Sequence, residues 1–138
     1  MKRLQWFFVL FGLIVAHASV AQTLAVGPVS GNEAALPIAV VPFAFEGAGM
    51  PPDTDIGAVI GGDLSRSGQF RALARQDIVE MPARPADVKF ATWRLLKQDF
   101  LVIGRISDAD AGALRIEFEL FDVAKQTRLM GLAIGARP

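Results

Sequence analysis

The segment that most limits the fold is Leu36 to Phe45, an apolar stretch with the sequence LPIAVVPFAF. Its centre is a short run of aliphatic and β-branched residues, which favours a buried β-strand. Pro37 and Pro42 bracket this run. Because proline lacks the N–H that a sheet ladder needs, we expect each of them at a strand end. A buried strand needs partners, so the rest of the chain must supply a sheet and a layer that covers it.

The first 21 residues have the three parts of a secretory signal peptide. Lys2 and Arg3 form a basic start, an 11-residue apolar run from Trp6 to Ala16 follows, and Ser19-Val20-Ala21 is a small-x-small cleavage sequence. Ala16-His17-Ala18 is a second such sequence, so cleavage after Ala18 stays open beside cleavage after Ala21. An uncleaved anchor is the alternative, but the run is shorter than the ~20 residues that span a bilayer. We therefore predict export to the periplasm and a domain division of 1–21, 22–35 and 36–138.

Residues 22–35, QTLAVGPVSGNEAA, form a flexible N-terminal segment in this prediction, because small residues, two glycines and a proline dominate it. Leu24 to Val26 could form a brief edge strand. One interpretation is a frayed terminus without a role. The other is a segment that pairs with the sheet edge of a partner protein.

Two helices are predicted after the first strand. Asp53, Thr54 and Asp55 offer N-caps for a helix that ends near Ser67, with Ile56, Val59, Ile60 and Leu64 on one apolar face. Its glycines weaken the helix but allow close packing on a sheet. The second helix is predicted over Asp87 to Gln98, with Phe90, Trp93 and Leu96 facing inward.

The remaining strands complete one sheet. A short strand is expected at Phe70 to Leu73, and Asp99 to Ser107 reads as a central strand covered on both faces. Leu114 to Val123 alternates apolar and charged residues until Phe121, where a bulge or strand end is expected. Arg128 to Ile134 is the last strand. The prediction is an α+β (mixed α/β) fold: a small mixed sheet that ends in an antiparallel meander, with two helices packed on one face.

The residue types argue against most enzymatic chemistry. The chain contains no cysteine, and its one histidine, His17, lies in the predicted signal peptide. The commonest zinc ligands and nucleophile–base pairs are therefore missing from the processed chain. Loss of Lys2 and Arg3 leaves 12 basic and 14 acidic residues, which is not the basic character of a nucleic-acid-binding protein. No catalytic residue, metal site or cofactor is predicted.

Four local features invite a functional interpretation and are better explained structurally. Gly57 to Gly62 lacks the spacing and the strand–helix context of a dinucleotide-binding loop. Asp108 and Asp110 have a D-x-D spacing, but a hairpin turn explains them better than a calcium loop. Glu117 and Glu119 share one face of a strand and suggest a solvated face rather than a carboxylate active site. Trp93, at helical spacing, is more often a core residue than a ligand-stacking one.

Five blocks of sequence, in this order and spacing, resemble the N-terminal domain of the TolB family. They are PIAVVPFAF, DIGAVIGGDLSRSGQF, WRLLKQDFLVIGRI, FELFDV and RLMGLAI. The resemblance runs from about Leu36 to the end of the chain. It implies a non-enzymatic periplasmic component of the Tol–Pal envelope system, with roles in outer-membrane integrity, cell division and macromolecule import. In the family a further helix and a β-propeller follow this domain, so the chain resembles a truncated member.

The same resemblance implies the partners. In the family the N-terminal segment contacts TolA, an inner-membrane protein, and the propeller contacts the lipoprotein Pal. Contact with a TolA-like protein is therefore expected from the N-terminal segment, and no contact with Pal is expected without the propeller. The implied partner-binding residues are Gln22, Thr23, Leu24, Ala25, Val26 and Val29. An alternative is an accessory α+β domain that binds a small molecule with the same fold.

Overall fold

The structure, a computed structural model, describes residues 35–137. The predicted signal peptide, nearly all of the 22–35 segment and the strand suggested at Leu24 to Val26 lie outside the described residues. Within them, one mixed sheet carries six strands, in the order β3-β1-β4-β5-β6 with β2 also paired to β4. The predicted α+β fold and the closing meander are confirmed.

The parallel half of the sheet is built from the first part of the chain. β1 (Leu36–Val40) pairs in parallel with β3 (Phe70–Ala72) on one side and β4 (Phe100–Asp108) on the other. β2 (Ala44–Phe45) follows β1 along the same edge of β4. The strand predicted over Leu36 to Phe45 is thus two strands, separated at Val41–Phe43 because Pro42 cannot donate to the ladder.

The antiparallel half is the predicted meander. β4 pairs with β5 (Leu114–Asp122), and β5 pairs with β6 (Thr127–Ala136). The register of β5 on β6 shifts between Leu120 and Phe121, where the sequence pattern predicts a bulge. Met130, Leu132 and Ile134 share one face of β6, as predicted, and pair with apolar residues of β5.

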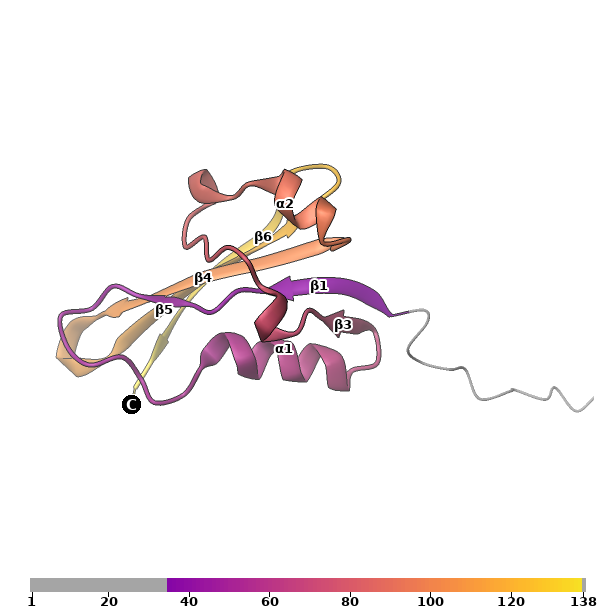
Figure 1. Ribbon diagram of the computed structural model, residues 1–138. Coiled ribbons are helices and arrows are strands. Elements are labelled where there is room, and N and C mark those ends of the chain that lie inside the picture. Colours follow the sequence, from indigo (N-terminus) through magenta and orange to yellow (C-terminus); the bar gives the residue numbers. More distant parts are fainter. Residues whose placement is uncertain (1–34, 138) are drawn as a thin grey trace, which may run out of the picture.

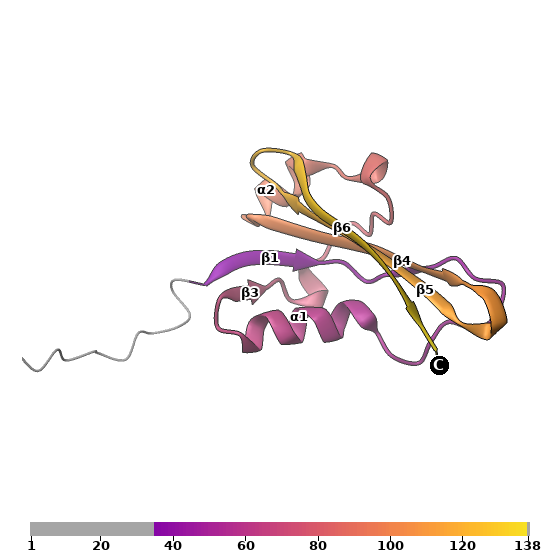
Figure 2. The same cartoon turned by 180° about the vertical axis from the view of Figure 1, so that it is seen from behind.

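The helices lie on opposite faces of the sheet, and the prediction of both on one face is wrong (Figure 1). α1 (Ile56–Arg66) covers the face of Ile38 and Val40, whereas α2 (Phe90–Leu95) brings Trp93 onto the other. Figure 2 shows the same two layers from behind. The reason is topological. The crossover from β1 to β3 and that from β3 to β4 run in opposite directions, and right-handed connections then fall on opposite faces.

Trp93 is the centre of the core on the α2 face. Its side chain is fully buried, and six buried residues pack with it: Ala39, Val41, Leu101, Ile103, Phe121 and Val123. The chain alternates between the two faces here, since Ala39 of β1 and Val41 directly after it join this cluster, whereas Ile38 and Val40 join the other. Trp93 is therefore a core residue, as favoured from the sequence.

α2 is shorter than predicted. It spans Phe90–Leu95 rather than Asp87 to Gln98, and a separate 3₁₀ turn occupies Pro85–Asp87. Lys89 at its N-cap accepts no side-chain capping bond, and Lys97 has a positive φ of 56° that ends the helical path. α1 starts as predicted, because the Asp55 carboxylate accepts a hydrogen bond from the Ala58 N–H at 3.0 Å.

The glycines of α1 allow close packing, as predicted, and they make a testable pair. A Cβ at Gly57 would lie 2.8 Å from the Val41 carbonyl oxygen, whereas one at Gly62 would meet only the end of the Arg66 side chain, at 3.4 Å. Gly57→Ala should therefore destabilise the domain by about 1–3 kcal/mol through overpacking against backbone. Gly62→Ala should stabilise it by roughly 0.5–1 kcal/mol through helix propensity. Urea unfolding measures both, and a stabilising Gly57→Ala would contradict this packing.

Candidate functional site

The predicted partner-binding residues, Gln22 to Val26 and Val29, lie outside the described residues, but their point of attachment is defined. Ala35 is buried, and the Leu36 N–H donates a hydrogen bond to the Gln69 carbonyl oxygen at 2.9 Å. Leu36 also pairs with Phe70 at the start of β3. The segment therefore joins the sheet at the end where β1 and β3 both begin.

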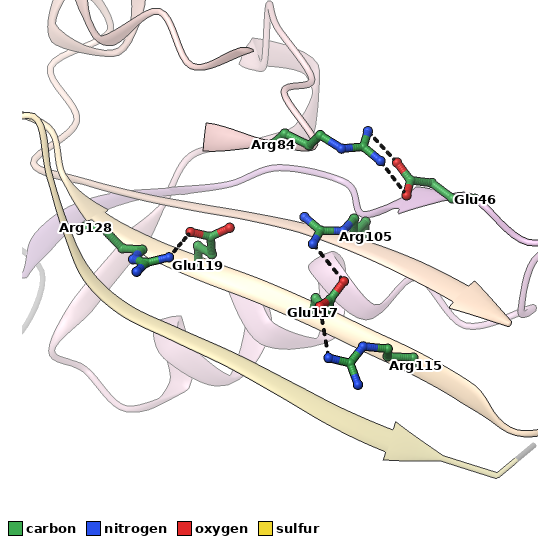
Figure 3. A network of polar contacts seen from close by, with 7 residues as sticks. All are labelled: Glu46, Arg84, Arg105, Arg115, Glu117, Glu119 and Arg128. Atoms are coloured by element: carbon green, nitrogen blue, oxygen red, sulfur yellow. Dashed lines mark hydrogen bonds and ion pairs between the residues drawn. The ribbon is translucent and has the colours of Figure 1, made fainter. Parts of the chain in front are cut away.

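A charged network occupies part of the sheet face opposite α1 (Figure 3). Glu117 on β5 accepts from Arg105 on β4 at 2.8 Å and from Arg115 at 3.2 Å. Along the same strand, Glu119 pairs with Arg128 of β6 at 3.1 Å. Two of these ion pairs, Arg105–Glu117 and Arg128–Glu119, join neighbouring strands, and they lie on the same face of the sheet as α2, beyond the part that α2 covers.

The arginines set the ionisation of Glu117. Desolvation of this carboxyl favours its neutral form, but the hydrogen bond from Arg115 and the charges of Arg105 and Arg115 outweigh it, so the pKa of Glu117 lies below its usual value. A general acid needs a raised pKa to hold its proton at neutral pH. Glu117 and Glu119 are both held by arginine, so this pair is organised for structure rather than proton transfer.

The lowered pKa of Glu117 predicts a pH effect. A carboxyl whose pKa is lower in the folded state than in the unfolded state stabilises the fold at any pH above its unfolded-state pKa. This contribution to stability is lost as the pH falls through the folded-state pKa. The Glu117→Gln variant should therefore be slightly less stable than the parent chain at pH 7. On acidification to about pH 3 it should lose less stability than the parent chain does. Thermal unfolding across that range measures the difference. Parallel curves for the two chains would show that the ion pairs contribute nothing.

The Asp108–Asp110 region forms the hairpin turn favoured from the sequence. A 3₁₀ turn, Asp110–Gly112, joins β4 to β5, with Ala111 and Gly112 at positive φ. The Asp108 carboxylate accepts from the Ala48 N–H at 2.6 Å and so tethers the loop after β2. Between residues 35 and 137 no group of three or more His, Cys, Asp or Glu side chains is placed to hold a metal ion.

An apolar groove of about 240 Å³ lies on the α1 face, beside the last strands. Its lining contains no polar surface and comes from α1 and five strands, through Ile38, Ile60, Leu64, Phe70, Phe100, Val102, Phe118, Leu120 and Met130. The alternation of β5 and β6 indicates which residues share this face. The sequence pattern did not indicate the groove, because its existence depends on how far α1 extends across the sheet.

None of the helices in the described part of the chain is long and apolar enough to cross a membrane.

The groove and Trp93 bear on the alternative function, the binding of a small molecule. A ligand site usually combines apolar walls with a few converging polar groups. Here Trp93 is enclosed in the core, and the phenylalanine-lined groove has apolar walls alone.

Comparison with known proteins identifies the family of this chain. Residues 24–129 match the TolB amino-terminal domain. The Tol-Pal system protein TolB of Xanthomonas euvesicatoria pv. vesicatoria (strain 85-10) is 49% identical over 138 residues, 99% of this chain and 31% of the relative. The TolB protein of Xanthomonas oryzae pv. oryzae (strain KACC10331 / KXO85) shows the same identity and coverage. The chain thus spans about a third of these relatives.

Solved structures agree with the fold. TolB from Acinetobacter baumannii superposes with a TM-score of 0.57 at 25% identity, over 72% of this chain and 23% of that protein. The LpoB C-terminal domain from Salmonella enterica gives a TM-score of 0.63 at 10% identity, over 76% and 84% of the two chains. The second likeness concerns the fold alone. The family match over most of the chain, together with the 49% identity, shows that this chain belongs to the TolB amino-terminal domain family of the Tol-Pal system.

Proposed function

We propose that this domain is a non-catalytic protein-interaction module of the Tol–Pal system that works in the periplasm. The match of residues 24–129 to the TolB amino-terminal domain is the observation that carries the proposal. In this proposal the first 21 residues are a cleaved signal peptide. The domain then contributes to outer-membrane integrity, cell division and macromolecule import through the proteins that it binds.

The contact with a TolA-like inner-membrane protein is assigned to the N-terminal segment, through Gln22, Thr23, Leu24, Ala25, Val26 and Val29. Two observations support this assignment. The segment is joined directly to β1, where the buried Ala35 and the Leu36–Gln69 hydrogen bond fix its base. Leu24 and Val26 alternate along the chain, as a strand that joins a partner's sheet requires.

Contact with Pal is not assigned to this domain. The chain covers 31% of the relative's length, and we assign the Pal contact to the propeller that the family resemblance implies for the remaining length. The small-molecule alternative has less support, because the groove lacks converging polar groups. The proposal of a non-enzymatic role rests on the residue types and on arginine-paired carboxylates rather than perturbed acids in a cleft.

A pull-down tests the assignment of the N-terminal segment. The processed chain and a version without Gln22 to Glu33 are each offered to the immobilised C-terminal domain of a TolA-like protein from the same organism. We expect the processed chain to be retained and the shortened chain to pass through, because the deletion removes the predicted strand but ends before the buried Ala35. Circular dichroism of the shortened chain is the control for folding. Equal retention of both chains, or of neither, would refute the assignment.

A further inference from the structure

Three large apolar side chains stand out from the α2 layer of the domain. Leu95 on α2 is 83% exposed, and Met81 and Val79, in the segment that leads to α2, are 68% and 64% exposed. Apart from Met50, every other large apolar residue of the described chain is less exposed than these three. We call Val79, Met81 and Leu95 the α2 patch. Apolar side chains that gather on one surface, unlike single ones, mark an interaction site.

A hydrogen bond places the three residues on the same side of the layer. Val79 and Met81 flank Glu80, whose carboxylate accepts from the Thr92 hydroxyl at 3.1 Å. Thr92 lies three residues before Leu95, so the two are neighbours on the surface of α2. The segment around Glu80 thus lies along the helix that carries Leu95. In both views α2 lies on one side of the sheet and the end of β6 on the other (Figures 1 and 2).

Positive charge is concentrated at the α2 patch. Arg94 and Lys97, on either side of Leu95 in the sequence, are exposed, and neither forms an ion pair with another residue of the described chain. Residues 78–98 contain four basic and two acidic side chains, whereas the rest of residues 22–138 contains eight basic and twelve acidic ones. The most exposed apolar part of the α2 layer is therefore also a basic part of an acidic chain.

We propose that the α2 patch binds the surface of a membrane that contains anionic phospholipids. The apolar side chains would enter the boundary between the headgroups and the acyl chains, while Arg94 and Lys97 meet the lipid phosphates. Three side chains bury much less apolar surface than a transmembrane helix or a pair of lipid anchors does. The binding is therefore peripheral and reversible.

A lipid surface fits the α2 patch better than an acidic protein does. Protein interfaces are usually centred on aromatic or arginine anchors that fill matching pockets. Trp93, the aromatic residue of α2 nearest to Leu95 in the sequence, is enclosed in the core, and the patch consists of aliphatic side chains and a methionine. A fluid bilayer accepts such protruding side chains without a matching shape. The inference goes beyond the proposed function and does not depend on the N-terminal segment.

Co-sedimentation of the processed chain with vesicles tests the charge requirement. Vesicles of phosphatidylcholine alone are compared with vesicles of phosphatidylcholine and phosphatidylglycerol in equal amounts, at low salt. We expect binding only to the second kind, and release as salt is added, because salt screens the attraction. The Arg94→Gln/Lys97→Gln variant should bind about 25-fold more weakly, since each basic residue near an anionic surface contributes roughly a factor of five.

The matched control removes the same charge elsewhere. Arg66 on α1 and Arg115 on β5 are exposed, and the Arg66→Gln/Arg115→Gln variant should bind within about twofold of the parent chain. Circular dichroism verifies that both variants fold. Equal binding of all three chains, or equal binding to the two kinds of vesicle, would overturn the inference. A parent chain that binds neither kind of vesicle would also overturn it and leave the α2 patch to an acidic protein.

A dye attached to single positions tests the entry of the apolar side chains. The chain contains no cysteine, so one introduced thiol carries the whole label. With a polarity-sensitive dye, Met81→Cys and Leu95→Cys should shift their emission to the blue when phosphatidylglycerol vesicles are added. Val59→Cys, a 47% exposed position on α1, should not. Unchanged emission at Leu95→Cys, or an equal shift at Val59→Cys, would contradict insertion through the α2 patch.

Discussion

Trp93→Ala should lower the free energy of unfolding by about 3–5 kcal/mol, the usual cost of removing a large buried aromatic side chain. Trp93 is fully buried among six apolar residues that lie in β1, β4 and β5 or directly after β1 and β5, so its loss leaves a cavity that rigid strands cannot fill. A domain of this size has a total stability of only about 5–15 kcal/mol. The variant should therefore be close to unfolded at 37 °C. Urea unfolding followed by circular dichroism measures the loss.

Two companion variants separate the volume of Trp93 from its polar group. The indole Nε1 is buried and makes no hydrogen bond in the structure, so Trp93→Phe removes volume without breaking a bond. It should cost clearly less than Trp93→Ala. Leu95→Ala, on the same helix but 83% exposed, should change stability by no more than about 0.5 kcal/mol. If Trp93→Ala costs no more than Leu95→Ala, Trp93 is not the centre of the core.

Paired substitutions in the N-terminal segment should give the second large effect, this time on binding. Leu24→Asp with Val26→Asp puts two charges on one side of the strand that we expect to join the sheet of a TolA-like protein. Desolvating an unpaired carboxylate at an interface costs several kcal/mol, so affinity should fall at least about 100-fold. The melting temperature of each variant is measured beside its affinity, so that a loss of binding is told apart from a loss of folding. Val79→Asp with Met81→Asp, at exposed positions of the domain, is the matched control.

Much of the sheet could be predicted from local pattern. The uninterrupted apolar run in β4 indicated a strand covered on both faces, and Leu101, Val102 and Ile103 are indeed buried. The break in alternation at Phe121 indicated the bulge that the register of β5 and β6 shows. These features depend on residues that are close in sequence, so the sequence contains them directly.

The placement of the helices could not be predicted in the same way. Which face α2 covers depends on the strand order, in which β1 lies between β3 and β4. The order results from long-range pairing, and no local period reports it. Val59, predicted on the buried face of α1, is 47% exposed, because Gly57 and Gly61 rather than Val59 approach the sheet most closely. The apolar groove follows from the same placement.

The charged network, too, could be predicted only in part from the sequence. The carboxylates Glu117 and Glu119 could be found from the alternation of β5, but their partners Arg105 and Arg128 come from neighbouring strands. A single strand pattern contains no information about such cross-strand pairs. The N-terminal segment was singled out by its position and by resemblance to a family. Its assignment as the partner-binding segment remains a prediction from sequence.

The most direct test is a calorimetric titration of the C-terminal domain of a TolA-like protein with three chains. These are the processed parent chain, the Leu24→Asp/Val26→Asp variant and the Val79→Asp/Met81→Asp control. We predict saturable binding for the parent chain and for the control, and an affinity at least about 100-fold lower for the N-terminal variant. Equal affinity of all three chains, or loss of binding only in the control, would show that the folded domain and not the N-terminal segment makes the contact.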